Sequence, residues 1–154
     1  MYSKVSKFLE QSNAIEGVYD ADSLVQACYA WEFITKEKEL TLNNIKKTHK
    51  ILMLHQLLRP DERGYFRQRP VYIGGKEATK YYFIKEYMKA WLFSCRLSPE
   101  HWKLQHIEYE KIHPFIDGNG RTGRIFMNWQ RIKAGLPILV IEESKKQDYY
   151  KWFK

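Results

Sequence analysis

Residues 113–124 read His-Pro-Phe-Ile-Asp-Gly-Asn-Gly-Arg-Thr-Gly-Arg and join two segments whose apolar residues have helical spacing. Gly118 and Gly120 can adopt positive φ, so main-chain N–H groups can converge just before a helix that we expect to begin near Arg121. Converging N–H groups at a helix N-terminus bind anions, and the helix dipole favours the same charge. The stretch therefore predicts an anion-binding loop between two helices.

The charged side chains of the same stretch indicate what the anion is. Arg121 and Arg124 follow in the first helical turn, where cations oppose the helix dipole, and their spacing suits a clamp on one polyphosphate. Asp117 supplies a carboxylate of the kind that holds Mg²⁺ beside phosphate oxygens. His113 is suited to accept a proton near neutral pH. Together they predict a Mg²⁺-nucleotide site with a general base, although a Gly-Asn-Gly loop by itself is commonly only a turn.

Helical spacing also dominates the chain on both sides of this loop. A first helix is predicted over residues 4–16 with Gly17 as its stop, and the helix after the loop is predicted to end at Gly135. Residues 64–77 break the pattern, because β-favouring residues precede a Gly-Gly turn, and we interpret them as extended or as a small hairpin. The predicted fold class is all-α with one short β-hairpin. Other helices are predicted to begin at Asp22 or Ser23, at Thr41, near Ala78, at Ser98 and near Glu142.

Composition limits the classes of partner. The 154 residues predict one domain, and 26 Lys and Arg against 18 Asp and Glu give a net charge of +8. The basic residues form separate clusters interleaved with acids, which argues against a specific nucleic-acid partner. The sequence has no membrane-length apolar run or signal peptide, and its two cysteines fit buried apolar positions. We therefore expect a cytoplasmic protein without a membrane partner.

Residues 113–124 match the motif of the Fic-domain family, His-x-Phe-x-(Asp/Glu)-Gly-Asn-Gly-Arg-x-x-Arg, at every defined position. The segment around residues 67–75 resembles the family's flap, a β-hairpin over the active site. Residues 135–137 and 148–150 also resemble the family, and the similarity extends over most of residues 40–150. The resemblance implies a helical bundle that carries a hairpin flap.

The resemblance also implies an activity, which is transfer of AMP from ATP to a Ser, Thr or Tyr hydroxyl of a protein, with Mg²⁺ and release of pyrophosphate. By that analogy His113 takes the proton from the target hydroxyl and Asp117 holds Mg²⁺. The family's kinase branch carries Lys where this chain has Gly120, which favours AMP transfer here. The implied phosphate-binding residues are Gly118, Asn119, Gly120, Arg121 and Arg124. The implied flap residues that hold the target in extended form are Arg67, Val71, Tyr72 and Ile73.

Ser12 and Glu16 lie four residues apart at the end of the first predicted helix. Taken alone, this pattern could be a helix end in which Asn13 and Glu16 form a capping pair. Residues 12–17 also resemble the family's inhibitory motif, (Ser/Thr)-x-x-x-Glu-(Gly/Asn). That resemblance implies that Glu16 pairs with Arg124 in place of the γ-phosphate, so that ATP binds in an unproductive pose.

The resemblance divides the chain into an inhibitory segment over residues 1–19 and a core over residues 20–154, with the flap at 64–77 and the motif at 113–124. The partner would be a protein substrate, the chain itself included, and two self-inhibited copies could form a homo-oligomer. Two other functions stay open, a hydrolase that removes AMP with the help of Glu16 and a silent ATP-binding regulatory module.

Overall fold

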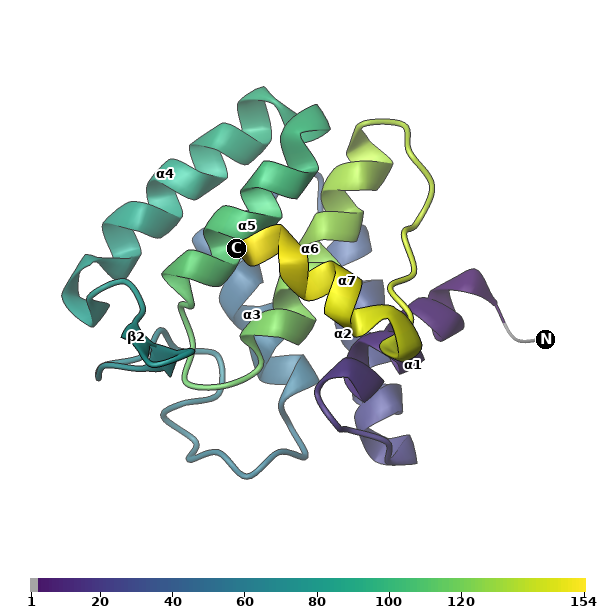
Figure 1. The fold of residues 1–154 in the computed structure, drawn as a ribbon, viewed down its shortest axis with the longest axis horizontal. Coiled ribbons are helices and arrows are strands. Elements are labelled where there is room, and N and C mark those ends of the chain that lie inside the picture. The colour runs from purple at the N-terminus through teal and green to yellow at the C-terminus, as the bar shows by residue number, and fades with distance from the viewer. Residues whose placement is uncertain (1–2) are drawn as a thin grey trace.

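The computed structural model describes residues 3–154. In this part, seven α-helices pack into a bundle with a two-stranded hairpin at one end (Figure 1). The predicted all-α fold with one short hairpin is confirmed. The α-helices are α1 (Lys4–Ile15), α2 (Ala21–Thr35), α3 (Leu42–Leu52), α4 (Ile84–Leu97), α5 (Trp102–Ile112), α6 (Asn119–Lys133) and α7 (Lys146–Tyr150). The strands are β1 (Tyr72–Ile73) and β2 (Lys76–Glu77), and short 3₁₀ turns are Tyr81–Phe83, Pro99–His101, Glu143–Lys145 and Lys151–Phe153.

The helix starts show which capping predictions hold. Thr41 caps α3 as predicted, and Asn44 completes a capping box by accepting a hydrogen bond from the Thr41 amide. The prediction of Asp22 or Ser23 as the cap of α2 is wrong, because the Asp20 carboxylate accepts the Ser23 amide at 2.9 Å. Both predicted caps therefore lie inside the first turn, where Ser23 donates rather than accepts.

Two other helices begin away from the predicted residues, for backbone reasons. The helix predicted near Ala78 starts later, at Ile84, because the Ala78 amide donates to the Val71 carbonyl and closes the hairpin. The helix predicted near Arg121 starts earlier, at Asn119, because Gly118 has φ +83° and turns the chain directly into it. Each shift follows from a backbone conformation that the side-chain pattern does not encode.

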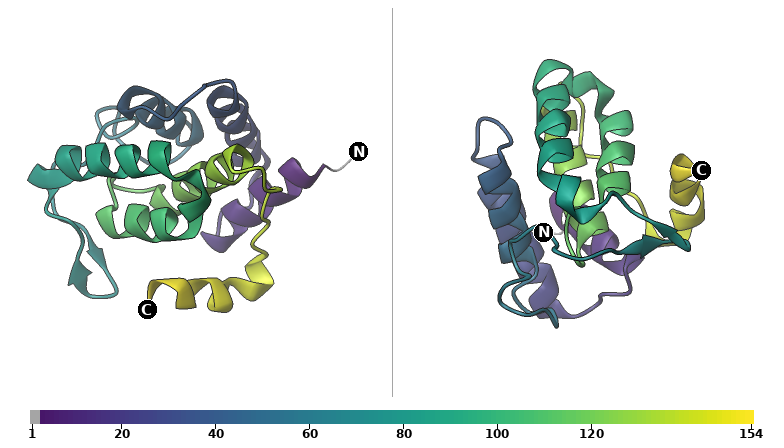
Figure 2. Two further views of the ribbon diagram at one scale, coloured as in Figure 1. Left: turned by 90° about the horizontal axis from the view of Figure 1, so that it is seen from above. Right: turned by 90° about the vertical axis from the view of Figure 1, so that its left-hand side faces the viewer.

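Helix α6 is the centre of the bundle. Every residue from 121 to 130 is buried, and the helix contacts α1, α2, α3 and α5. The C-terminal segment, residues 143–153, crosses the face of the bundle opposite α2 and α3 (Figure 2). No helix within residues 3–154 combines the length and the apolarity that crossing a bilayer requires. The motif lies at the N-terminus of the central helix α6.

Helices α5 and α6 approach closely at Gly123. A Cβ atom on Gly123 would lie 2.7 Å from Glu110 Oε1, 3.0 Å from Tyr109 Cδ1 and 3.1 Å from His106 Cε1. Glycine is otherwise unfavourable inside a helix by about 1 kcal/mol relative to alanine. The close approach favours glycine here, since a larger residue would displace the Glu110 carboxyl and press on the Tyr109 and His106 rings.

The hairpin is shorter than the extended segment predicted for residues 64–77, because its strands include only residues 72–73 and 76–77. Tyr72 pairs with Glu77 and Ile73 with Lys76, and Gly74 and Gly75 turn the chain with φ +56° and +82°. Positive φ at both turn residues matches a turn of type I′, which fits the twist of a two-stranded hairpin. Residues 64–71 form irregular loop rather than strand.

Arg67 lies outside the hairpin. The resemblance implied that its side chain contacts a target, but the side chain is buried. Its side chain is 2% exposed, and its guanidinium donates to the carbonyls of Ile112, His113, Arg69 and Thr79. A guanidinium that satisfies four carbonyls beneath the hairpin has no surface to offer a target. Arg67 instead ties the loop before the hairpin to the end of α5.

We predict that Gly123→Ala destabilises the fold by about 1–3 kcal/mol, because the added methyl overpacks the α5–α6 contact. An open helical position would gain from the same change, so the sign of the effect tests the contact. The measurement is the urea midpoint at constant m-value. Shortening Glu110 in the same chain, as Glu110→Ala, should restore part of the loss; a midpoint unchanged or raised in Gly123→Ala would contradict the contact.

Candidate active site

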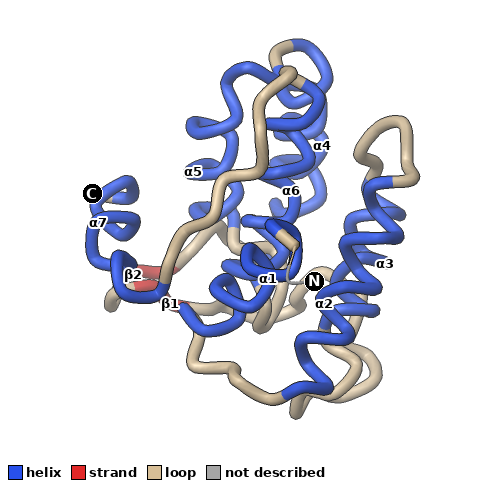
Figure 3. The backbone as a smooth tube through the Cα atoms, turned by 90° about the vertical axis from the view of Figure 1, so that its right-hand side faces the viewer, coloured by secondary structure: helices blue, strands red, loops and turns tan. Residues whose placement is uncertain are grey.

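A cleft of about 870 Å³ opens at the N-terminus of α6. It is lined by Glu16 after α1, by Glu110 of α5, by His113 directly after α5, and by Arg124 of α6. The hairpin and the C-terminal segment form its remaining sides, and Figure 3 shows these two parts near each other at one end of the molecule. Segments far apart in the sequence thus meet at one concave site, as expected of a ligand site.

The loop between α5 and α6 is fixed through its main chain. His113 has φ +51° and is the only residue other than glycine with positive φ in the described part of the chain. Arg67 holds this turn, since its Nε donates to the His113 carbonyl at 2.7 Å and its amide donates to the Pro114 carbonyl. Phe115 is fully buried and its ring stacks on His49 at 3.8 Å. The positive-φ turn at His113 is thereby held in place by the surrounding structure.

His49, which sequence reasoning did not single out, joins this loop to residue 64. The Gly64 amide donates to His49 Nδ1 at 2.9 Å, so the ring proton is on Nε2, which donates to the Asp117 carbonyl at 2.8 Å. Burial lowers the pKa of His49 to about 4, which keeps this tautomer neutral. No sequence signal marks it, because a histidine with helical spacing resembles any core position.

Asn119 holds the loop rather than offering its side chain to a ligand. Its Oδ1 accepts the Phe115 amide at 2.9 Å and its Nδ2 donates to the Phe115 carbonyl at 2.8 Å. The implied phosphate contact is therefore corrected for its side chain, and only its main-chain N–H at the helix start can serve. The first N–H groups of a helix have no intrahelical acceptor, so those of residues 119–121 face the cleft end of α6.

His113 has the geometry of a base. Its Nδ1 lies 3.2 Å from the Glu110 carbonyl, which can only accept, so Nδ1 carries the proton and Nε2 keeps its lone pair. Burial lowers the pKa of His113 below its usual value, and the Arg67 cation acts in the same direction. The ring is therefore neutral and able to accept a proton at pH 7.

Arg121 is a buried cation without an anionic partner. It is 3% exposed, its Nη2 donates to the Met53 sulfur at 3.3 Å, and its Nε and Nη1 have no partner within residues 3–154. A buried guanidinium with unmet donors is costly unless an anion completes it. Of all the features of the site, this one points most directly to a bound anion.

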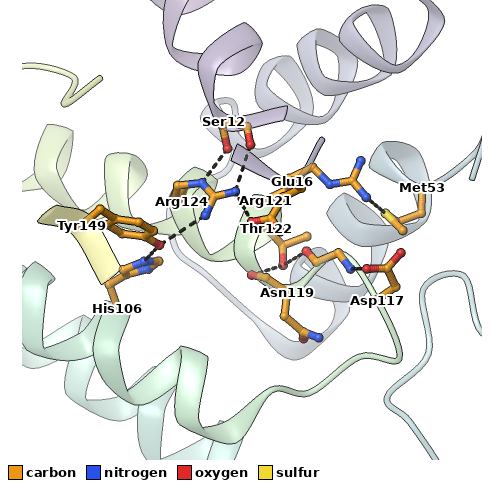
Figure 4. A network of polar contacts seen from close by, with 11 residues as sticks. Ser12, Glu16, Met53, His106, Asp117, Asn119, Arg121, Thr122, Arg124 and Tyr149 are labelled. Atoms are coloured by element: carbon orange, nitrogen blue, oxygen red, sulfur yellow. Dashed lines mark hydrogen bonds and ion pairs between the residues drawn. The ribbon is translucent and has the colours of Figure 1, made fainter. Parts of the chain in front are cut away.

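Arg124 is the most connected side chain of the site (Figure 4). It is 2% exposed, and its Nη2 is 2.8 Å from Glu16 Oε1. Its Nε donates to Ser12 Oγ at 2.8 Å, its Nη2 to the Ser12 carbonyl at 3.0 Å, and its Nη1 to the Tyr149 hydroxyl at 3.3 Å. The structure brings Ser12, Glu16 and Arg124 together as the resemblance implies.

The Glu16 carboxylate lies directly beside Gly120 of the loop. A Cβ atom on Gly120 would lie 2.5 Å from Glu16 Oε1 and 3.0 Å from Arg124 Nη1, so a larger residue would displace the ends of both side chains. The Glu16 side chain is 39% exposed, whereas its partner is buried. An anion on Arg124 and the Glu16 carboxylate would compete for the same guanidinium.

Glu110 adds a second carboxyl beside Arg124. Its Oε1 is enclosed and has no hydrogen-bond partner in the described part of the chain. Burial raises its pKa to about 7, the Arg124 cation opposes the rise, and the Glu16 carboxylate adds to it. Nothing in the sequence alone shows that the Glu110 carboxyl reaches the cleft, because helical spacing does not separate this position from a packing or surface residue.

Asp117 is exposed at the rim of the loop, where its Oδ1 accepts the Gly118 amide at 2.8 Å. Residues 3–154 contain no group of three or more His, Cys, Asp or Glu side chains placed to hold a metal ion. A single carboxylate next to a phosphate site suits Mg²⁺, which is usually bound by one or two carboxylates and by substrate phosphates. The donor set therefore fits Mg²⁺ carried by a nucleotide.

The hairpin edges the same cleft. Tyr72 and Ile73 are exposed, at 66% and 43%, and Val71, directly before β1, is half-buried. Ile73 and Gly74 line the cleft together with His113. Of the residues implied to dock a target, these three lie on the hairpin, and Arg67 lies beneath it.

Comparison with known proteins connects this geometry to a family. The sequence model of the Fic/DOC family matches residues 39–130. A protein adenylyltransferase Fic of Drosophila erecta is 32% identical over 155 residues, which cover 96% of this chain and 30% of the relative. The corresponding protein of Drosophila grimshawi is also 32% identical, again over 96% of the chain and 31% of its own length. The chain thus spans less than a third of the length of these relatives.

Solved structures show the same fold. A Fic-domain signalling protein from Bacteroides thetaiotaomicron superposes with a TM-score of 0.81 at 21% identity, covering 95% of this chain and 69% of that one. Fic-1 from Caenorhabditis elegans gives 0.80 at 20% identity, covering 98% and 55%. The family match spans more than half of the 154 residues and includes the loop, His113 and both arginines. The chain is therefore a member of the Fic/DOC family.

Proposed function

We propose that this chain transfers AMP from ATP to a hydroxyl group of a protein and that Glu16 restrains this activity. The observation that carries the proposal is the pair of buried arginines at the N-terminus of α6, one without an anion, beside the free Nε2 of His113. The relatives named protein adenylyltransferase support the reaction class. A cationic site next to a neutral base suits group transfer from a nucleotide to a hydroxyl.

In the proposed reaction, His113 Nε2 takes the proton of the target hydroxyl. The hydroxyl oxygen then forms a bond to the α-phosphorus of ATP as the bond to the pyrophosphate oxygen breaks, and pyrophosphate leaves. Arg121 and Arg124 bind the β- and γ-phosphates, and the open amides of α6 bind phosphate oxygens. Asp117 would hold Mg²⁺, which when bound offsets the negative charge of the phosphates.

The hairpin supplies the place for the target. Each strand of a two-stranded hairpin has one edge that its partner does not use, and such an edge can pair with an extended peptide. Ile73 lines the same cleft as His113. We propose that a target segment lies along this edge, with Val71, Tyr72 and Ile73 contacting it, so that its hydroxyl reaches the base.

Inhibition follows from competition for Arg124. While Glu16 holds Nη2 at 2.8 Å and covers Gly120, a γ-phosphate cannot take the same guanidinium edge. The triphosphate then binds out of line with the hydroxyl, and transfer stops. A hydrolase that uses Glu16 would instead release AMP from a modified protein. The two reactions are distinguished by whether labelled AMP is gained by an unmodified protein or lost from a modified one.

We predict that Glu16→Gly raises AMP transfer by about tenfold or more, because loss of the carboxylate frees Arg124, and a half-exposed ion pair contributes on the order of 1–2 kcal/mol. The measurement is label transfer from α-³²P-ATP with Mg²⁺ to the chain itself and to proteins of a cell lysate. Glu10→Gly, on an exposed part of α1, is the control for loss of a carboxylate. Equal labelling by wild type and Glu16→Gly would contradict inhibition, and no label in any lane despite ATP binding would exclude AMP transfer.

We predict that His113→Ala in the Glu16→Gly background lowers transfer by at least about a hundredfold, the range of general-base catalysis. ATP affinity by calorimetry should change less than about threefold, since His113 has no phosphate to bind. His101→Ala, an exposed histidine outside the cleft, is the matched control and should transfer normally. Retained transfer in His113→Ala would remove the base from the mechanism.

We predict an acid limb in the pH profile of kcat/KM for Glu16→Gly, with a midpoint below 6.5. Burial lowers the pKa of His113, so its neutral form accumulates as pH rises through that lowered value and the rate becomes level above it. Glu110, whose pKa is raised to about 7, is the other group of the cleft that titrates nearby. The profile should keep its midpoint in Glu110→Gln; a midpoint above 7 that vanishes in that variant would assign the limb to Glu110.

A further inference from the structure

The partners of Arg124 divide into two groups (Figure 4). Three of its hydrogen bonds go to the inhibitory end of the chain, namely to Ser12 Oγ, the Ser12 carbonyl and Glu16 Oε1. The fourth goes to the hydroxyl of Tyr149, at 3.3 Å. When α1 no longer holds Arg124, the first three are lost together, and among the described residues Tyr149 is the remaining hydrogen-bond partner.

The hydrogen bonds around Tyr149 have a fixed direction. A guanidinium can only donate, so the Tyr149 oxygen accepts from Arg124 and its own proton must go elsewhere. His106 Nε2 lies 2.6 Å away and accepts it, which requires that the proton of the His106 ring is on Nδ1. His106 is 2% exposed, and burial together with the Arg124 cation lowers its pKa to about 3, so the ring stays neutral. The hydroxyl is therefore oriented with its lone pair toward Arg124.

Tyr149 is held by contacts that do not involve α1. Its ring packs against Trp152 at 5.1 Å and Phe153 at 5.2 Å within the C-terminal segment, and against His106 of α5 at 5.8 Å. Trp152 is in turn fixed on α5 by Trp102 at 6.1 Å. The contacts between the C-terminal segment and α1 lie earlier, where the Glu143 amide donates to Gln11, so the aromatic cluster can persist when α1 moves.

We propose that Tyr149, backed by His106, is a positioning residue that holds the Arg124 guanidinium toward the β- and γ-phosphates of the nucleotide when α1 is displaced. The proposal rests on the proposed function, since it assigns a released state in which Arg124 binds phosphate. Without the hydroxyl, the long Arg124 side chain regains rotamers that a bound phosphate must then restrict. The enclosed Glu110 carboxyl beside it would also attract the guanidinium away from the nucleotide.

The test uses Tyr149→Phe in the Glu16→Gly chain and compares the binding of ATP with that of AMP by calorimetry. Loss of one hydrogen bond to a charged group corresponds to roughly a tenfold effect. We expect ATP affinity to fall about tenfold and AMP affinity to stay within twofold, because AMP lacks the phosphates that Arg124 would bind. The KM for ATP should rise by a similar factor. Tyr29→Phe, which removes an exposed hydroxyl from α2, should change neither affinity.

A second variant tests the backing role of His106. His106→Leu should weaken ATP binding in the same direction, and adding it to Tyr149→Phe should weaken binding no further, since both act through one hydroxyl. Thermal midpoints of all variants establish that the fold is intact. If a Tyr149→Phe chain does not fold, His106→Leu alone still decides whether ATP loses affinity relative to AMP.

Three outcomes would overturn the proposal. Unchanged ATP affinity and KM in Tyr149→Phe would remove the positioning role. Equal losses for ATP and AMP would mean that Tyr149 contacts the nucleoside directly. Full additivity of the two substitutions would separate His106 from Tyr149. If Glu16→Gly binds ATP but transfers no AMP, the proposed function fails while the comparison of ATP with AMP still tests positioning.

Discussion

The fold is organised around one buried cation. Arg124 lies on the central helix α6 and is enclosed by the end of α1 and by the C-terminal segment. Burying a guanidinium is favourable only when acceptors surround it, and these acceptors come from segments 112 and 25 residues away along the chain. Helix α1 and the C-terminal segment therefore both contribute acceptors to the same Arg124 side chain. An incoming polyphosphate has to join or replace these partners.

A second constraint is the main chain of the loop before α6. Arg67, His49 and Asn119 all use their side chains to satisfy backbone groups of residues 112–117, so none of the three is free to bind a ligand. The loop can keep a strained turn at His113 because these contacts surround it. Rigidity below the loop leaves the amides at the start of α6 and the free nitrogen of His113 as its reactive surface.

The helices, the turn at Gly74 and the motif residues were predictable because each depends on local spacing or on glycine conformation. The contacts that individual side chains make were not predictable from the sequence. Arg67 and Asn119 carry groups that could bind phosphate equally well, and only the three-dimensional course of residues 64–71 places carbonyls around the first. Tyr149 stands in a segment that resembles the family, yet its bond to Arg124 requires the C-terminal segment to cross α5. Long-range packing decides such contacts, and one sequence does not encode them in any local pattern.

Helix α1 is connected to the body of the molecule by a very short linker, since α1 ends at Ile15 and α2 begins at Ala21. A group held by so few residues acts at an effective concentration that reaches the millimolar range or more, whatever the amount of protein in solution. Dilution cannot release it, and a detached copy of α1 would compete only at comparable concentrations. The release of α1 is therefore governed by an intramolecular equilibrium constant, which changes only when something alters the Glu16–Arg124 contact or the surfaces against which α1 packs.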